Sequence, residues 1–163
     1  MCCKLPRWRL VRIVCVVALF FMPGNETLAS DDLREQVLTI LAALDDQTLP
    51  VASQLALYSD DIVLLAPDAP AVRGTEALRA HLTAFAGNTG LTIRHELRHL
   101  DITADVVIAE GGVIGEVASQ DDAPPYRFAT HNLIVFKRHS DDSLTIWKVI
   151  YNAAPLPANS DDD

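Results

Sequence analysis

Two kinds of hydrophobic pattern divide the chain at about residue 90. Before Gly90, apolar residues recur mostly at spacings of three and four, which is typical of amphipathic helices. After Gly90 they alternate with polar residues over long segments, which is typical of strands. Helices followed by long strands predict an α+β fold, with the helices packed on one face of an antiparallel sheet.

The boundaries of the elements follow from turn and capping residues. Ser30, Asp31 or Asp32 can cap the first helix, and Gly87-Asn88 can end the third. Gly111-Gly112 predicts a bulge or bend within a strand. The predicted helices are 31–44, 49–58 and 76–86, and the predicted extended segments are Ile62–Ala66, Ala71–Arg73, Leu91–Ile102, Val106–Ala118, Tyr126–Arg138 and Leu144–Ala153.

Residues 1–29 have the pattern of a secretory signal peptide. Four basic residues precede the apolar run Ile13–Met22, and small residues follow it. The run is shorter than the roughly 20 apolar residues that a membrane-spanning helix needs. We expect cleavage after Ala29 or, as a second choice, after Ser30, and hence a periplasmic or secreted protein. An uncleaved anchor is the alternative.

Cleavage changes the composition of the chain. All three cysteines lie in the leader, so the mature chain would have no disulfide and no thiolate. The leader also holds four of the 13 basic residues and one of the 22 acidic ones, which leaves 9 against 21 and a net charge of −12. This charge disfavours binding to nucleic acid or to anionic membranes. We expect no stable membrane insertion after cleavage, and a disordered acidic tail over 156–163.

Two segments carry a resemblance to a known family. One is Leu57–Leu82, in which Tyr58-Ser59-Asp60-Asp61, an apolar run, Pro67 and Val72-Arg73-Gly74 precede a helix, and the other is Trp147–Asn152. Together they resemble the SnoaL-like branch of the nuclear transport factor 2-like superfamily. The resemblance places one such domain over 30–155.

The resemblance implies more than the hydrophobic pattern does. It implies a strongly curved antiparallel sheet wrapped around three N-terminal helices, forming a cone whose mouth can hold a small molecule without a cofactor. It also implies a homodimer formed through the sheet. The expected outward face of the last two strands is apolar, which favours burial against a second subunit. That face is expected to carry Ile134, Phe136, Ile146 and Ile150.

The catalytic residues of ketosteroid isomerase, a relative in this superfamily, are missing from the matching positions. The position of its carboxylate base falls at Ala66, and that of its helical tyrosine at about Ile40. Its neutral aspartate falls near Thr130-His131-Asn132, where there is no carboxylate. Because proton abstraction next to a carbonyl needs a base within hydrogen-bond reach, steroid isomerase chemistry is disfavoured.

Another base could occupy the same cavity. An imidazole acts as acid or base near neutral pH, and His131 lies in an apolar strand. Successive strand residues point to opposite faces, so His131 and Asn132 cannot both face the cavity. We expect His131 to face inward with Ala129, Leu133 and Val135. The alternative is that it faces solvent or a dimer contact. The other candidate pocket residues are Tyr58, Trp147, Tyr151 and Asn152.

His95 and His99 are the remaining candidates for chemistry. On a strand, four residues separate side chains by about 13 Å, which is too far for one metal ion to bind both. We therefore interpret both as structural or surface residues and expect no metal site.

Three functions fit these observations. The first is an exported protein that binds a small, largely apolar molecule without specific catalysis. The second is a cofactor-free enzyme of the isomerase or cyclase type that uses His131. The third is a dimeric assembly domain without a ligand.

Overall fold

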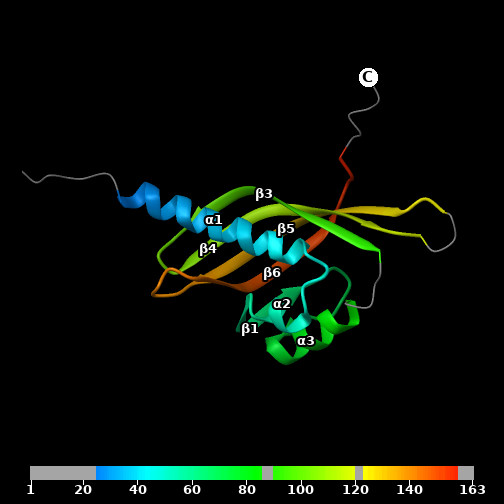
Figure 1. The fold of residues 1–163 in the computed structure, drawn as a ribbon, viewed down its shortest axis with the longest axis horizontal. Coiled ribbons are helices and arrows are strands. Elements are labelled where there is room, and N and C mark those ends of the chain that lie inside the picture. The colour runs from blue at the N-terminus through cyan, green and yellow to red at the C-terminus, as the bar shows by residue number, and fades with distance from the viewer. Residues whose placement is uncertain (1–24, 86–89, 120–122, 158–163) are drawn as a thin grey trace, which may run out of the picture.

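The computed structural model describes residues 25–85, 90–119 and 123–157 (Figure 1). Most of the predicted leader and of the acidic tail therefore lies outside the described residues. The elements, in chain order, are α1 (Asn25–Asp45), α2 (Val51–Leu55), β1 (Tyr58–Leu65), β2 (Val72–Arg73), α3 (Gly74–Phe85), β3 (Leu91–Ile102), β4 (Val106–Val117), β5 (Tyr126–Arg138) and β6 (Leu144–Ala154).

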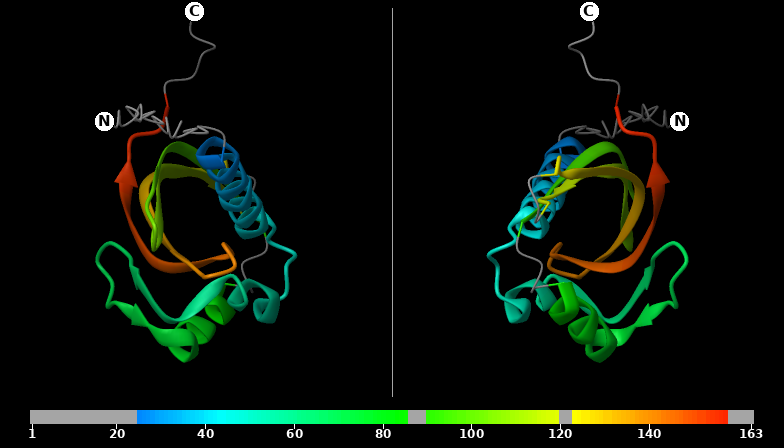
Figure 2. Two further views of the ribbon diagram at one scale, coloured as in Figure 1. Left: turned by 90° about the vertical axis from the view of Figure 1, so that its left-hand side faces the viewer. Right: turned by 90° about the vertical axis from the view of Figure 1, so that its right-hand side faces the viewer.

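The six strands form one sheet in the order β2-β1-β6-β5-β4-β3. All neighbouring strands are antiparallel except β1 and β6, which are parallel, so the sheet is mixed rather than purely antiparallel as expected. β1 and β6 are far apart in the sequence, and no short hairpin forces them to be antiparallel. Figure 2 shows the strong curl of the sheet, with α1 lying across its concave side, as expected for the cone fold.

Glycines and bulges allow the sheet to curl. A Cβ on Gly111 would overlap the backbone carbonyl of Glu96, and one on Gly112 would overlap that of Thr130. Glycine at both positions therefore lets β4 approach its neighbours closely. The ladder also shifts register at Arg98 in β3 and at Trp147 in β6. Each extra residue bends its strand and reverses which side chains face inward.

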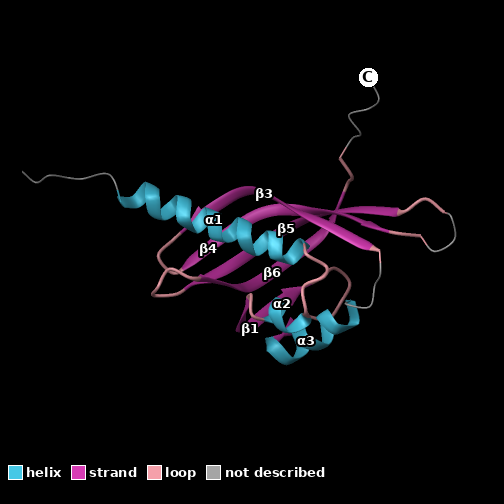
Figure 3. Cartoon of the chain, viewed as in Figure 1, coloured by secondary structure: helices cyan, strands magenta, loops and turns pink. Residues whose placement is uncertain are grey.

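The helices cover the concave side and the edge of the sheet. α1 contacts β3 and β6, whereas α3 contacts β1 and β2 (Figure 3). The core between helices and sheet consists of fully or nearly fully buried side chains, among them Leu33, Val37, Ile62, Leu78, Val107, Phe136 and Ile146. No helix among the described residues is both long and apolar enough to cross a membrane.

Two element boundaries differ most from the sequence prediction. α1 begins at Asn25 rather than near Asp31. β1 begins at Tyr58 rather than Ile62, so Tyr58 belongs to a strand and not to the preceding helix. The reason is long-range pairing, because the Ile146 amide donates to the Leu57 carbonyl at 2.8 Å and draws this segment into the sheet. Strand pairing has overridden the local helical pattern.

Candidate ligand-binding cavity

A cavity of about 500 Å³ lies inside the curve of the sheet. Its apolar wall combines strand residues such as Leu64, Ile93, Val113, Phe128 and Val149 with Leu44, Val51 and Leu82 from the helical part. The polar groups that reach it include Tyr58, His81, His95, Thr130, Asn132 and Tyr151. Among the described residues, neither a carboxylate nor a Lys or Arg side chain lines this cavity. The volume and the mainly apolar wall are those of a small-molecule site.

The inward face of β5 carries Thr130 and Asn132. The Thr130 hydroxyl donates to Asn132 Oδ1 at 2.6 Å, and Thr130 Oγ1 accepts from the Val113 amide at 3.2 Å. Asn132 is buried, and its Oδ1 is engaged by Thr130. Its amide nitrogen is therefore the group left to donate to a molecule in the cavity.

The prediction that His131 faces the cavity is wrong. His131 lies on the convex face of β5, exposed, with its Nδ1 3.3 Å from Nη1 of Arg98. Both faces of β5 contain apolar residues, so alternation alone could not choose between them. The inner face of β5 instead carries two polar residues, Thr130 and Asn132, which hydrogen-bond to each other.

Tyr58 and Tyr151 both line the cavity, as expected. Burial raises the pKa of Tyr58 to about 12, and it also raises the pKa of Tyr151. Both phenols therefore stay protonated at neutral pH and can donate hydrogen bonds.

Trp147 and Asn152 lie on the convex side of the sheet instead. The extra residue in β6 turns Trp147 outward, where its Nε1 donates to Asp61 Oδ2 at 3.0 Å. The Lys137 ammonium lies 2.6 Å from Asp61 and is the main reason that the pKa of Asp61 falls to about 2. Asn152 is exposed and pairs across the strands with His131.

The sequence interpretation missed a contact between His95 and Asp45. His95 lines the cavity from β3, and its Nδ1 lies 2.7 Å from Asp45 Oδ1. The His95 amide also donates to both carboxylate oxygens, at 3.1 and 3.0 Å. Asp45 is the last residue of α1, 50 positions away in the chain.

The register shift at Arg98 separates the two histidines of β3. Leu97 and Leu100 both pack against the core, so His99 faces outward, with its Nε2 3.1 Å from Asp101. Of the two histidines of β3, His95 therefore faces the cavity and His99 does not. The alternation of Ile93, His95 and Leu97 in the sequence indicates that these three side chains share a face of the strand. This pattern could have placed His95 in the cavity wall, whereas the sequence analysis interprets it as a structural or surface residue. In the described part of the chain, no cluster of three or more potential ligand side chains is arranged around a metal position.

A second histidine, His81 of α3, also lines the cavity. Its pKa is lowered from the ordinary value because burial disfavours the charged imidazolium. His81 is therefore biased toward the neutral form, which suits an apolar site.

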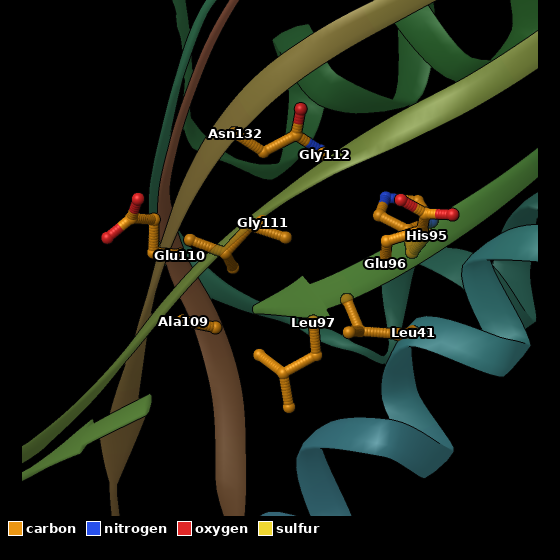
Figure 4. A pocket seen from close by; sticks show the side chains of 10 residues that line it. Leu41, His95, Glu96, Leu97, Ala109, Glu110, Gly111, Gly112 and Asn132 are labelled. Atoms are coloured by element: carbon orange, nitrogen blue, oxygen red, sulfur yellow. The ribbon is translucent and has the colours of Figure 1, made fainter. Parts of the chain in front are cut away.

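The region behind His95 is closely packed. A small hollow of about 10 Å³ separates Leu41 of α1 from the sheet, and both His95 and Asn132 border it (Figure 4). In Figure 4, Leu41 and Leu97 approach each other while the Glu110 carboxylate points away from both. Glu110 is exposed, so it does not add an acid to the interior.

The convex face of the sheet carries a short apolar row, although not one made of the residues expected. Ile134, Phe136 and Ile146 are 3%, 0% and 0% exposed and belong to the core, so placing them on the outer face was wrong. Only Ile150 lies outside, 48% exposed. Leu65 pairs with Ile150 and Ile150 with Leu133, giving an exposed row across β1, β6 and β5. We call these three residues the convex apolar row.

The curved sheet, its helices and its cavity define a cone-shaped α+β domain of the ligand-binding or isomerase/cyclase type. A family model described as the SnoaL-like domain matches residues 37–145. The chain therefore belongs to the SnoaL-like family, within the nuclear transport factor 2-like superfamily, as its sequence motifs predict. No curated protein matches the sequence significantly.

Solved structures share the fold at low sequence identity. A ketosteroid isomerase-like protein from Erwinia carotovora atroseptica is 19% identical with a TM-score of 0.63, covering 81% of this chain and 99% of that one. An NTF2-like protein of unknown function from Pseudomonas putida is 21% identical with a TM-score of 0.60, covering 82% and 92%. A Catenulispora acidiphila structure in complex with S-DNPA is 16% identical with a TM-score of 0.60, covering 78% and 95%.

Proposed function

We propose that this protein binds one small, uncharged and largely apolar molecule in the cavity of the cone. The observation that carries the proposal is the cavity of about 500 Å³, lined by apolar side chains and a few convergent polar groups. Binding sites for small molecules have volumes of this order and this kind of wall.

The polar groups restrict the chemistry of the ligand. Asn132, Tyr58 and Tyr151 supply hydrogen-bond donors, which suit a carbonyl or hydroxyl oxygen. A charged ligand would lose its hydration without gaining a paired charge, because the described wall holds no carboxylate and no Lys or Arg. The Catenulispora acidiphila neighbour, which is in complex with S-DNPA, supports the proposal that a protein of this fold can hold a ligand.

Export and dimerisation form part of the same proposal. The predicted leader would direct the chain out of the cytoplasm, and cleavage after Ala29 would leave Leu33 and the buried stripe of α1 in the mature protein. The convex apolar row would be covered by the same row of a second copy. Face-to-face packing of this kind buries an apolar surface that a monomer would expose.

Native mass spectrometry of the protein purified from its own host tests the binding proposal. We expect a retained small molecule that is released on denaturation. Val113→Trp should remove it by filling the cavity, whereas the control Leu38→Trp, on the exposed side of α1, should keep it. Circular dichroism shows whether both variants are folded. A folded wild-type protein that retains no ligand and binds no apolar ketone would contradict the proposal.

A further inference from the structure

We propose that Asp45 and His95 form a proton-transfer pair that acts on a carbonyl compound held in the cavity. The inference rests on the proposed function and adds a chemical step to it. His95 is the catalytic residue, because it lines the cavity, and Asp45 is a positioning residue, because it contacts His95 and is not part of the cavity wall.

The hydrogen bonds fix the orientation of the imidazole. Nδ1 of His95 lies 2.7 Å from the Asp45 carboxylate, so Nδ1 carries the hydrogen in the neutral ring. Nε2 then carries the lone pair. The His95 side chain is 11% exposed, and its Nε2 makes no hydrogen bond to another described residue. Nε2 is therefore the basic atom available to a ligand in the cavity that His95 lines.

An acidic side chain at the position of Asp45 is unfavourable for the stability of α1. Asp45 is the last residue of α1, where the helix dipole disfavours an acid, and the last turn contains no basic residue. Its carboxylate instead accepts from the His95 amide and from the ring. One explanation is structural, since β3 is an edge strand and Asp45 satisfies an amide there. That explanation accounts for the amide contact but not for the additional bond to a ring that faces the cavity.

The donors on the cavity wall complement this base. Thr130 holds Asn132 by its carbonyl oxygen, which leaves the amide nitrogen to donate. Tyr58 and Tyr151 add hydroxyl donors to the same cavity. A base together with donors for an oxygen is the combination needed to remove a proton next to a carbonyl.

The step balances without a cofactor. Nε2 of His95 takes a proton from the carbon next to the carbonyl, and the C–H electron pair forms a second bond between that carbon and the carbonyl carbon. The π pair of the carbonyl moves to its oxygen, which accepts hydrogen bonds from the donors. The imidazolium then returns the proton to the same carbon or to a conjugated one. The pair lies elsewhere than the position that the family resemblance implies for a base, which holds Ala66 in this chain.

Deuterium exchange tests the proposal with 2-tetralone, a small uncharged ketone with an acidic C–H at carbon 1. The mature protein is mixed with the ketone in D₂O, and loss of the carbon-1 signal is followed by proton NMR. We expect wild-type protein to accelerate exchange at least tenfold over buffer, and His95→Gln to abolish the acceleration. His99→Gln, on the outer side of the same strand, should keep it.

Asp45→Asn separates positioning from structure. We expect slower exchange in this variant and a change in the ¹⁵N chemical shifts of His95 toward the tautomer protonated at Nε2. A purely structural contact would lower stability and leave the exchange rate of the folded protein unchanged. Binding of 2-tetralone in the cavity without accelerated exchange, or exchange that survives His95→Gln, overturns the proton-transfer pair and leaves the binding proposal intact. Failure of 2-tetralone to bind in the cavity overturns the proton-transfer pair for this class of ketone, and it overturns the binding proposal as well when the purified protein also retains no ligand.

Discussion

Asp45 Oδ1 lies 2.7 Å from Nδ1 of His95, which joins the last residue of α1 to the middle of the edge strand β3. The contact does two things at once. It ties the long helix to the strand at the open edge of the sheet, and it orients an imidazole at the cavity wall. The open edge of the sheet therefore joins α1 to β3 and holds the imidazole of the proposed proton-transfer pair.

Phe136 is the largest of the fully buried side chains, so its truncation tests the core. Phe136→Ala should lower the free energy of unfolding by about 3–5 kcal/mol, because it removes apolar contacts and leaves a cavity. Leu38→Ala on the exposed side of α1 is the control, with an expected change within about 0.5 kcal/mol. Urea unfolding measures both. Equal effects in the two variants would show that β5 does not pack as described.

Tyr58 should make the protein sensitive to alkali. Its pKa is about 12 in the folded protein against 10.0 for the free side chain, so the unfolded chain loses this proton first. Stability is therefore present below pH 10 and declines as the pH rises toward about 12. Ultraviolet absorbance of the phenolate should show a late step that Tyr58→Phe removes. Because the pKa of Tyr151 is also raised, the comparison is made in a Tyr151→Phe background, where a late step that survives Tyr58→Phe would contradict the assignment.

Asp61 should contribute to stability with the opposite dependence on pH. Its pKa falls from 3.8 to about 2, mainly through the bond from Lys137, so its contribution is present above pH 3.8 and is lost as the pH falls through about 2. Asp61→Asn should flatten the decline in stability over this range. Asp60→Asn leaves the Lys137–Asp61 pair in place and should not. Urea unfolding across this acidic range distinguishes the two variants.

The convex apolar row should control self-association. Ile150→Lys places a charge in the centre of the proposed interface and should convert dimers to monomers, because an unpaired buried charge is costly. Leu156→Lys, equally exposed but beyond the end of β6, should leave the dimer intact. Light scattering coupled to size-exclusion chromatography measures the mass. A wild-type protein that is monomeric at high concentration would rule out this interface.

The alternating pattern predicted the long strands well because each strand has one face in the core. Leu91–Ile102 and Tyr126–Arg138 have the bounds that the sequence indicates. The start of β1 was missed because its pairing partner, Ile146, is far away in the chain. Local patterns contain no information about such a partner.

The orientation of side chains was harder to predict than the strands themselves. Alternation is reliable only until a bulge, and the extra residues at Arg98 and Trp147 exchange the faces in the second half of β3 and the first half of β6. Trp147 was placed in the pocket wrongly for this reason. The prediction for His131 was wrong for a different reason. Its neighbours on the same face of β5 include the apolar residue Leu133, which is exposed on the convex side and does not line the cavity. Asp45 was overlooked because its partner, His95, is brought to it only by the folded sheet.

The central claim is that the cavity, rather than the convex face, receives the ligand. Methyl chemical-shift mapping during titration with 2-tetralone tests it most directly, because Val, Leu and Ile residues line both surfaces. The account predicts the largest shifts at Val113, Val149 and Ile93, which line the cavity. Shifts confined to Leu133 and Ile150 of the convex apolar row, with none in the cavity, would contradict it.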